Sequence, residues 1–392
     1  MKFSLQYITK KGRLGSISEI ERLPLAAFDT PLMLFTTSGG TVPHLTHETL
    51  EMMTKKSLAL QLPLASNLRA LAATRESKFN IAEFIGMKES LTLCSVNDPL
   101  VPLPGGFNQK NSVAVWKKEG RESVNEVAYM DAMESLRPDL YQTLCDSETD
   151  AESTAKRLQR SVKSTAGFFE YCLERHKNSK VLEKSSILAS LVGGFCSERR
   201  RQLTKEMASQ PVDGFVIDGF NVAGAKGESA KVELVRELVK ETIADLPEAK
   251  LRVLPGCWSP EALWDLVQEG VDVFDSSLPT AVAERGSALT FKFCPKTKSF
   301  SYNFEHGGEN ELKSYEISLK DKTYFERLEP ILEGCECVAC KNHTKAYIHH
   351  LMVTKELLGH VLLMLHNLHH YQLFFDKMRE AIREDKEETA ES

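Results

Sequence analysis

The sequence contains no apolar run of the roughly 18 to 20 residues that a membrane-spanning helix requires. Its N-terminal stretch, MKFSLQYITKKGRLG, also lacks the apolar core of a signal peptide. Excess positive charge is missing too, because 49 Lys and Arg residues face 55 Asp and Glu residues, a net charge of −6. We therefore expect a soluble intracellular protein whose contacts with nucleic acid, if it makes them, are local or shared with a partner.

Cysteine is too sparse for a disulfide scaffold, with nine residues in a chain of 392. Six lie singly, mostly in apolar stretches, and are expected as small core residues: Cys94, Cys145, Cys172, Cys196, Cys257 and Cys294. The other three, Cys335, Cys337 and Cys340, lie within six residues in the segment GCECVAC. Thiolate sulfur is the preferred ligand of closed Zn²⁺ sites, so this spacing predicts a structural zinc site.

A tetrahedral zinc site needs a fourth ligand, and histidine is the natural candidate. Seven of the eleven histidines fall between His343 and His370. Spacing alone does not choose among them, since His366, His369 and His370 all lie in one predicted helix. Because such a site has no open position, removing its metal should unfold the surrounding subdomain rather than stop a reaction.

Short apolar runs alternate with helical patterns from about residue 138 onward, which is typical of repeated βα units. The expected strands there are 138–145, 186–193, 213–220, 250–256 and 271–278, with helices at 152–176 and 229–246 between them. In the first third of the chain, 31–37, 90–96 and 112–116 are expected as further strands. No Gly-x-Gly-x-x-Gly follows a strand, so the pattern favours a closed (β/α)8 barrel of the TIM type over an open doubly wound sheet.

The pattern changes near residue 296, where a polar stretch leads into the cysteine cluster and a long apolar helix at about 344–375. We predict a barrel domain at 1–295, then a zinc-binding subdomain at 296–375 whose long helix packs on the barrel. Residues 376–392 are expected as a charged, frayed C-terminal tail.

Carboxylates at the ends of barrel strands are candidates for chemistry. Asp275 ends a strand predicted to be buried, where a carboxylate is costly unless it is paired or used, so it is either a nucleophile or general base or a cap for the following turn. Asp146 and Asp218 also lie at the ends of expected strands and are weaker candidates for the same roles. The run SERRRQLTKE at 197–206 is expected as a solvated helix face, with contact to phosphate as the alternative.

Taken together, these residues resemble the tRNA-guanine transglycosylase family, whose members exchange guanine in a tRNA anticodon for queuine or a precursor. That family's zinc signature is Cys-x-Cys-x-x-Cys followed by a His 26 positions later, and here 366 minus 340 gives 26. The resemblance thus implies one structural Zn²⁺ per subunit, held by Cys335, Cys337, Cys340 and His366. The segments 254–280 and 30–50 resemble the approach to the family's catalytic Asp and its first barrel strand and helix.

The departures from the family pattern lie at its reactive positions. Its catalytic subunits carry Thr-Asp-Ser-Gly-Gly-Phe-Gln at a strand end, and an alignment of residues 84–98 puts Cys94 at the position of that Asp, with Val96 and Asn97 in place of the glycines. Other family motifs are also altered: Asp-x-Cys reads Asp146-Ser147-Glu148, the Gln of Gln-Gly-Gly is Val192, the Gly-Gly-Leu-Ala-Val-Gly loop reads DGFNVAG at 218–224, and the anticodon-holding arginines are Ala281 and Glu284.

Asp275 matches the family's nucleophile position, but a nucleophile needs a base pocket and a proton-handling partner. The pattern therefore resembles the family's non-catalytic subunit: no catalytic residues are expected, and Asp275 is a vestige. The resemblance implies a heterodimer with the catalytic subunit, which exchanges guanine 34 for queuine in tRNA with a GUN anticodon. It also implies a cytoplasmic location with peripheral association with the mitochondrial outer membrane.

Two alternatives remain. In one, the chain forms an active homodimer that exchanges a tRNA base with Asp275 as the nucleophile, which the intact FDSSLPT segment favours. In the other, the family match is chance and the chain is a zinc-stapled barrel unrelated to tRNA.

Overall fold

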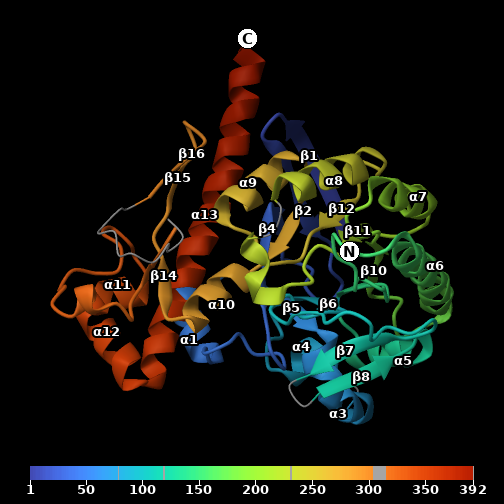
Figure 1. The fold of residues 1–392 in the computed structure, drawn as a ribbon, viewed down its shortest axis with the longest axis horizontal. Helices are drawn as coiled ribbons and strands as arrows, with labels where there is room; N and C mark the ends of the chain where they lie inside the picture. Colours follow the sequence, from blue (N-terminus) through green and yellow to red (C-terminus); the bar gives the residue numbers. More distant parts are fainter. Residues whose placement is uncertain (78, 118–119, 230–231, 303–314, 392) are drawn as a thin grey trace. The chain divides into compact units, whose positions relative to one another are not determined.

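The computed structural model describes residues 1–77, 79–117, 120–229, 232–302 and 315–391 (Figure 1). The chain forms two compact units. The first comprises Met1–Gly40 and Ser57–Asp275, and the second comprises Thr41–Lys56 and Ser276–Ser392. These units do not test the domain limits predicted at residues 295 and 375, which stay predictions.

Eight parallel strands of the first unit close into a barrel in the order β10-β11-β12-β13-β4-β5-β6-β9. Their bounds are β4 Leu32–Thr36, β5 Ala59–Pro63, β6 Leu91–Ser95, β9 Leu140–Gln142, β10 Ser186–Leu191, β11 Gly214–Ile217, β12 Leu251–Val253 and β13 Val273–Asp275. Almost every residue in them is buried, as expected for strands covered on both faces. The predicted closed barrel is confirmed.

Seven of the eight expected strands belong to the barrel, but the eighth was assigned wrongly. Residues 113–116 of this segment lie in β7, Val113–Lys117, which pairs with β8, Gly120–Val124, in an antiparallel hairpin outside the barrel. The strand that sequence analysis missed is β5. It carries the polar Gln61 in its middle and ends on Pro63, and both residue types are uncommon in buried strands. In the fold, the Gln61 side chain accepts a hydrogen bond from the Thr36 hydroxyl, and the Gln61 carbonyl oxygen accepts one from the Thr37 hydroxyl.

A three-stranded antiparallel sheet, β1-β2-β3, begins the chain and was not predicted. Its strands are β1 Lys2–Thr9, β2 Gly12–Ser18 and β3 Phe28–Thr30. Ile17, Ile20 and Phe28 of this region join the interior barrel residues in one apolar cluster. Buried Arg13 of β2 pairs with buried Asp272, with Nε 2.7 Å from Oδ1, which fixes the sheet to the barrel.

Helices follow the barrel strands in the first unit. They are α2 Leu64–Asn67, η1 Leu68–Ala70, α3 Leu71–Ser77, α4 Ile81–Phe84, α5 Glu126–Leu136, α6 Ala155–Asn178, α7 Ser197–Ala208, η2 Gly224–Ser229, α8 Val232–Ala244 and α9 Pro260–Gln268. The expected helices at 152–176 and 229–246 correspond to α6 and α8. Thr154 and Ser259 cap α6 and α9 with side-chain hydrogen bonds, and Pro260 occupies the first turn of α9.

The second unit contains α1 His47–Met53, α10 Ser277–Glu284, η3 Lys322–Tyr324, α11 Val338–Asn342, α12 Lys345–Thr354 and α13 Leu357–Glu391. Two small antiparallel sheets accompany them: β14 Ser287–Leu289 with β17 Glu316–Ser318, and β15 Lys292–Cys294 with β16 Ser299–Ser301. Among the described residues of the chain, no helix is long and apolar enough to cross a membrane.

The helix predicted at 344–375 is two helices, because Lys355 adopts the left-handed conformation (φ 60°) that ends α12. The second of them, α13, does not stop at Phe375 and continues to Glu391, so the charged end is helical rather than frayed. The reason is that Met378, Ala381 and Ile382 extend the buried apolar stripe at helical spacing.

Candidate functional site

The three strand-end carboxylates predicted from the sequence all lie in the first unit and are buried. Asp275 closes β13 with 2% exposure, and its Oδ2 accepts a hydrogen bond from the Gly256 main-chain N–H at 2.8 Å. Asp218 follows β11, and its carboxylate accepts from the Gly219 N–H and from Gln142 Nε2 at 2.6 and 3.1 Å. Both carboxylates therefore bind loop main chain or side chains at the carboxyl ends of barrel strands.

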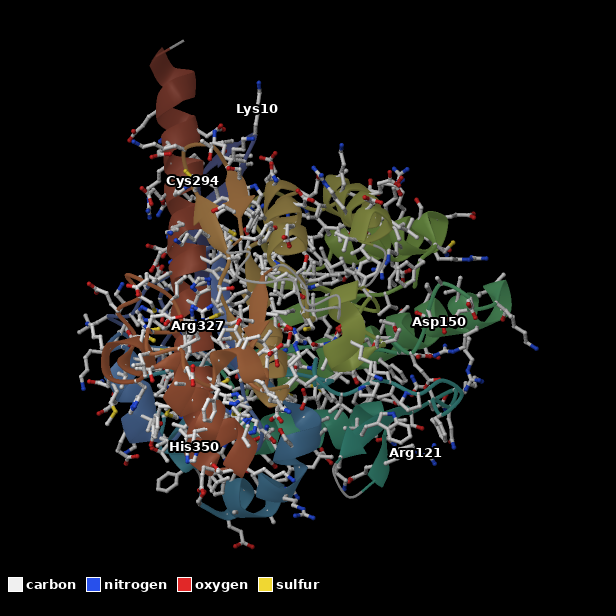
Figure 2. All side chains as sticks on the ribbon, turned by 60° about the vertical axis from the view of Figure 1, so that its left-hand side comes forward. Lys10, Arg121, Asp150, Cys294, Arg327 and His350 are labelled. Carbon is white, nitrogen blue, oxygen red and sulfur yellow. The ribbon has the colours of Figure 1, made fainter. Side chains whose placement is uncertain are left out.

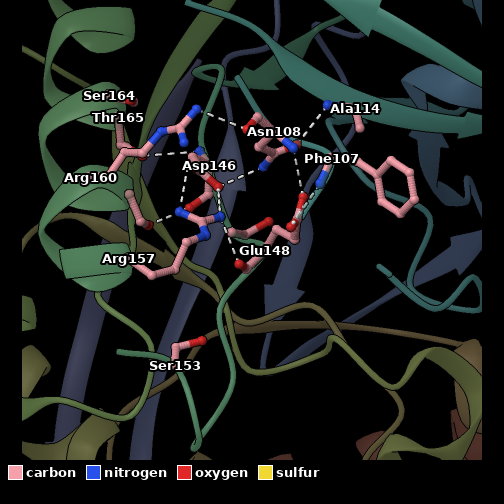
Figure 3. A network of polar contacts seen from close by, with 12 residues as sticks. Phe107, Asn108, Ala114, Asp146, Glu148, Ser153, Arg157, Arg160, Ser164 and Thr165 are labelled. Atoms are coloured by element: carbon pink, nitrogen blue, oxygen red, sulfur yellow. Dashed lines mark hydrogen bonds and ion pairs between the residues drawn. The ribbon is translucent and has the colours of Figure 1, made fainter. Parts of the chain in front are cut away.

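Asp146, after β9, is held by the side chains of Arg157 and Asn108 (Figure 3). Arg157 of α6 approaches it with both terminal nitrogens, Nη1 2.8 Å from Oδ2 and Nη2 2.6 Å from Oδ1. Asn108 Nδ2 donates to the same Oδ1 at 2.6 Å. With 1% exposure, Asp146 is a buried carboxylate whose charge is matched by a bidentate guanidinium.

Glu148 occupies the position of the family's Cys in Asp-x-Cys and is also engaged. Its carboxylate accepts the main-chain N–H groups of Gly106, Phe107 and Asn108, the last two at 3.2 and 3.0 Å. The intervening Ser147 accepts from Asn97 Nδ2 at 2.8 Å. The segment Asp146–Glu148 thus holds the loop at 105–108 in place.

Asn108 is the residue that sequence analysis overlooked. Residues 105–108 read Gly-Gly-Phe-Asn, which matches the second half of Thr-Asp-Ser-Gly-Gly-Phe-Gln, and this triple was the available signal. With these glycines matched, the family's Asp falls at Leu103; with the alignment from residue 84, it falls at Cys94. Neither residue is an acid. Burial raises the pKa of the Cys94 thiol to about 12, so it is neutral at physiological pH.

Arg200 shows that the run SERRRQLTKE is not simply a solvated face. Its guanidinium is 1% exposed, donates to the carbonyl oxygens of Gly194 and Asp218 at 2.7 Å each, and lies 3.7 Å from the centre of the Phe220 ring. Burial lowers its pKa to about 9. The expectation fails for Arg200 because its side chain packs inward, while its neighbour Arg201 forms an ion pair with Asp245 at 3.0 Å.

The two positions that replace the family's arginines lie in the second unit. Ala281 is buried in α10, and exposed Glu284 pairs with His44, Oε1 to Nε2 at 3.0 Å. His44 in turn stacks on His360 of α13, with ring centres 5.1 Å apart. Neither position offers a positive charge.

The cysteines and the histidine that the resemblance selects come together in the second unit. Ligand atoms of Cys335, Cys337, Cys340 and His366 all lie within 4.8 Å of one another, and the group could hold a metal ion. His366 Nδ1 is 3.8, 3.5 and 3.3 Å from the three sulfurs in chain order. A tetrahedral zinc ion separates sulfur and nitrogen ligands by about 3.6 Å, so the cluster fits this ion.

The local structure explains how the cluster is assembled. Cys337 caps α11, where its Sγ accepts the Cys340 N–H at 3.3 Å. His366, fully buried in α13, places its Nε2 2.8 Å from the Leu289 carbonyl oxygen, which leaves Nδ1 facing the sulfurs. A carbonyl that receives the second ring N–H is the usual way to orient a metal-binding histidine.

Proton affinities in the cluster are shifted by the crowding of its four groups. Hydrogen bonds with the Cys337 and Cys340 thiols lower the pKa of Cys335 well below its usual range, whereas those with Cys335 and Cys337 raise the pKa of Cys340. Burial opposes a charge on His366, yet its contacts with Cys335 and Cys337 outweigh burial and raise its pKa to about 10. Here a thiolate and an imidazolium stabilise each other. A bound divalent metal ion would take the place of the imidazolium charge and stabilise the thiolates itself.

His369 and His370, which spacing had left as alternatives, are not part of the cluster. Burial lowers the pKa of both imidazoles, that of His370 to about 3. Two other histidines of the enriched region bind main-chain carbonyls, His349 at Leu319 and His360 at Ala283, with Nδ1–O distances of 2.8 and 3.1 Å. These contacts account structurally for part of the histidine enrichment.

The family model and the similar proteins agree on one family. A family model described as Queuine tRNA-ribosyltransferase matches residues 9–391. A human protein named queuine tRNA-ribosyltransferase accessory subunit 2 is 38% identical over 407 residues, covering 98% of this chain and 97% of its own. Proteins of the same name from Xenopus tropicalis and Drosophila virilis are each 36% identical, covering 98% of this chain and 96% and 90% of their own.

Proposed function

Because this chain belongs to the queuine tRNA-ribosyltransferase family, we propose that it is the non-catalytic subunit of a heterodimer. In that complex the catalytic paralogue exchanges guanine 34 for queuine in tRNA with a GUN anticodon, and this chain supplies interface and RNA-contacting surface. The observation that carries the proposal is the engagement of Asp146, whose buried carboxylate is bound by Arg157 and Asn108.

The loss of base-handling groups supports this role. A nucleophile contributes to base exchange only when the base is positioned and a proton can be transferred. At the aligned positions Cys94 is a buried neutral thiol, Val192 is apolar and Glu148 is bound to main-chain N–H groups. Asp275 keeps its place at the end of β13.

We propose that one structural Zn²⁺ ion per subunit is held by Cys335, Cys337, Cys340 and His366. These four side chains would fill all four coordination positions of a tetrahedral ion. A structural zinc site has four protein ligands, whereas a catalytic site leaves one position open for water or substrate. The ion would tie α11 to α13 and the Leu289 carbonyl, so its role is to stabilise the second unit.

Exposed apolar side chains of the second unit support the proposal that this chain binds a protein partner. Large apolar groups normally lie inside, and a cluster of them at the surface marks an interaction site. The exposed ones in this unit are Met52, Phe325, Leu328, Tyr347, Val353, Leu357, Leu358 and Leu373, with Leu357 83% and Leu328 75% exposed. We propose that the catalytic subunit covers some of these side chains.

The location implied by the resemblance is cytoplasmic, with peripheral association with the mitochondrial outer membrane. This association stays a prediction. Fractionation of cells that express the tagged chain, with and without the catalytic subunit, measures how much chain sediments with mitochondria and whether salt or protease releases it.

Guanine exchange tests the proposed function. The chain is purified alone and with its catalytic paralogue, and incorporation of labelled guanine into tRNA with a GUN anticodon is followed. We expect exchange by the complex and background incorporation by the isolated chain. Turnover by the isolated chain comparable to that of the complex would contradict the proposal and favour the alternative, an active homodimer that uses Asp275, whose supporting observation is the buried carboxylate at the end of β13.

A further inference from the structure

A groove of about 790 Å³ in the first unit is bordered by basic side chains that the family resemblance does not explain. Lys156, Arg160 and Lys163 project into it from α6, and Lys110 from the loop that precedes β7. Among the described residues that line it, one is acidic: Glu126, at the start of α5. We call this feature the basic groove.

The charge of the basic groove contrasts with that of the chain. Four cationic side chains face one carboxylate there, whereas the whole chain has a net charge of −6. Lys110, Lys156 and Lys163 are exposed, and none of the ion pairs found among the described residues involves them. Unpaired cations gathered in a concave surface focus a positive potential and attract an anionic partner.

The cations of α6 also have a regular spacing. Residues 156, 160 and 163 follow the i, i+4, i+7 pattern of one helix face, so they form a row about 10 Å long. A row of point charges matches a polymer of phosphates better than it matches a single small anion.

The loop that carries Lys110 is fixed against α6. Arg160 Nη2 donates to the Asn108 carbonyl oxygen at 2.9 Å, and Ser164 Oγ donates to that of Lys110 at 3.2 Å. Asn108 is itself anchored on Asp146. The lysine main chain is therefore positioned before any ligand binds, which reduces the entropic cost of binding.

An exposed aromatic residue belongs to the same loop. Phe107 is 41% exposed, and Figure 3 shows its ring pointing away from the polar network of Asp146 and Glu148. The Trp116 ring meets it edge to face at 5.1 Å, and the Arg121 guanidinium lies 4.9 Å from its centre. Arg121 stands at the outer surface of the β7–β8 hairpin (Figure 2). Exposed aromatic rings beside cations take up unpaired nucleobases by stacking.

We infer that the basic groove and Phe107 together bind a strand of RNA, with Lys110, Lys156 and Lys163 on successive phosphates and the Phe107 ring on an unpaired base. This inference rests on the proposed function, which makes tRNA the partner, and it assigns the contact to a particular surface of the accessory chain. An acidic protein segment would use the lysines but would not require the base-stacking ring.

Salt dependence of tRNA binding tests the phosphate contacts. The complex of this chain with its catalytic subunit is titrated with fluorescent tRNA at several salt concentrations. In the triple variant Lys110→Ala, Lys156→Ala, Lys163→Ala we expect the slope of log affinity against log salt to fall by about 2 to 3. Affinity should fall at least tenfold at physiological salt.

The matched control removes three exposed lysines from other surfaces of the first unit, as Lys10→Ala, Lys205→Ala, Lys240→Ala. Lys10 is labelled in Figure 2, and Lys205 and Lys240 lie on α7 and α8. Both triple variants change the net charge by the same amount, so a long-range charge effect would alter both equally. Identical slopes and affinities in the two variants would overturn the inference.

Phe107→Ala separates stacking from charge. Loss of one stacked base should weaken tRNA binding by about five- to a hundredfold while leaving the salt slope unchanged. Phe107→Trp should restore the affinity. A Phe107→Ala variant that binds tRNA as the unaltered complex does would remove the stacking contact from the inference.

The outcomes also separate this inference from the proposed function. If the complex exchanges guanine but the basic-groove variant binds tRNA as the control does, only the inference is wrong. If no exchange occurs but the variant loses tRNA binding, the RNA surface stands and the proposed function fails. Absence of tRNA binding by the unaltered complex, or displacement of tRNA by polyglutamate as effectively as by unlabelled RNA, would overturn the inference.

Discussion

Arg157 and Asp146 form a bidentate ion pair between the start of α6 and the loop after β9, with Nη1–Oδ2 and Nη2–Oδ1 distances of 2.8 and 2.6 Å. Arg157 Nη2 also donates to the Glu148 carbonyl oxygen at 2.7 Å. A single side chain thus fixes both ends of the segment Asp146–Glu148, which aligns with the family's Asp-x-Cys motif. These contacts connect the loop after β9 to α6.

Arg157→Ala should destabilise the first unit, because it leaves the Asp146 carboxylate, 1% exposed, without its counter-charge. Breaking such a pair costs about 3 kcal/mol, and the partial exposure of Arg157 places this site at or below that figure. Arg157→Lys should recover less than half of the loss, since an ammonium cannot bind both oxygens. Urea unfolding measures both variants, with Arg199→Ala, at a partly exposed arginine, as the control. Equal stability of Arg157→Ala and the control would contradict the structural role.

Arg200→Lys should be destabilising by about 2 to 3 kcal/mol although it conserves charge. The guanidinium bonds to the carbonyl oxygens of Gly194 and Asp218 and stacks on Phe220, and one ammonium cannot make all these contacts. Arg199→Lys, on a partly exposed neighbour in the same helix whose guanidinium contacts Gln202, should change the free energy of unfolding by less than about 0.5 kcal/mol. A similar small effect in both variants would show that the buried contacts contribute little.

The barrel could be predicted from the sequence because parallel strands buried on both faces read as apolar runs. The strand β5 was not predicted because its middle residue, Gln61, is polar. Its hydrogen-bond partner Thr36 lies in the neighbouring strand, so the sequence of β5 alone does not show that Gln61 can be buried. The grouping of Cys335, Cys337 and Cys340 could also be predicted, because these three candidate ligands are local in sequence. The fourth candidate, His366, lies 26 residues after Cys340, and the family resemblance rather than the local pattern selects it.

Contacts between residues far apart in the sequence could not be predicted from local patterns. Asn108 and Asp146 are 38 residues apart, and the Arg200 contact with Asp218 spans 18. Nothing in either local pattern distinguishes an arginine that packs inward from one that is solvated.

Removal of one thiolate tests the metal site. In Cys337→Ser we expect the zinc content to fall from one ion per chain to near zero after dialysis, since the hydroxyl is a poor ligand for this ion. The second unit should then unfold at a lower temperature, because the ion contributes to folding. Cys294→Ser is the matched control, because this cysteine of the same unit lies outside the cluster and is exposed, contrary to the expectation that it is a core residue. Full zinc content in Cys337→Ser would exclude the ligand set.

His176 should contribute to the loss of stability in acid. Burial lowers the pKa of His176 below its ordinary 6.5, and its Nδ1 lies 2.8 Å from the Tyr141 hydroxyl. The unfolded chain therefore binds a proton at pH values where the folded chain does not, so the free energy of unfolding falls as the pH drops below about 6.5. His176→Asn should flatten the stability curve between pH 7.5 and 5.5, whereas His47→Asn, at an exposed site, should leave it unchanged. Parallel curves for His176→Asn and the unaltered protein would contradict this assignment.

Asp275→Asn in the heterodimer distinguishes a vestigial carboxylate from a working one. The Asn side chain retains an oxygen that can accept the Gly256 N–H, so the end of β13 should keep its structure. If the partner supplies the nucleophile, the rate of guanine exchange by the complex should stay within about twofold of the unaltered rate. Loss of the nucleophile of the reacting subunit instead removes a covalent step and costs several orders of magnitude. An exchange rate reduced a thousandfold, in a complex that still assembles and binds tRNA, would show that Asp275 reacts and that this chain is an enzyme.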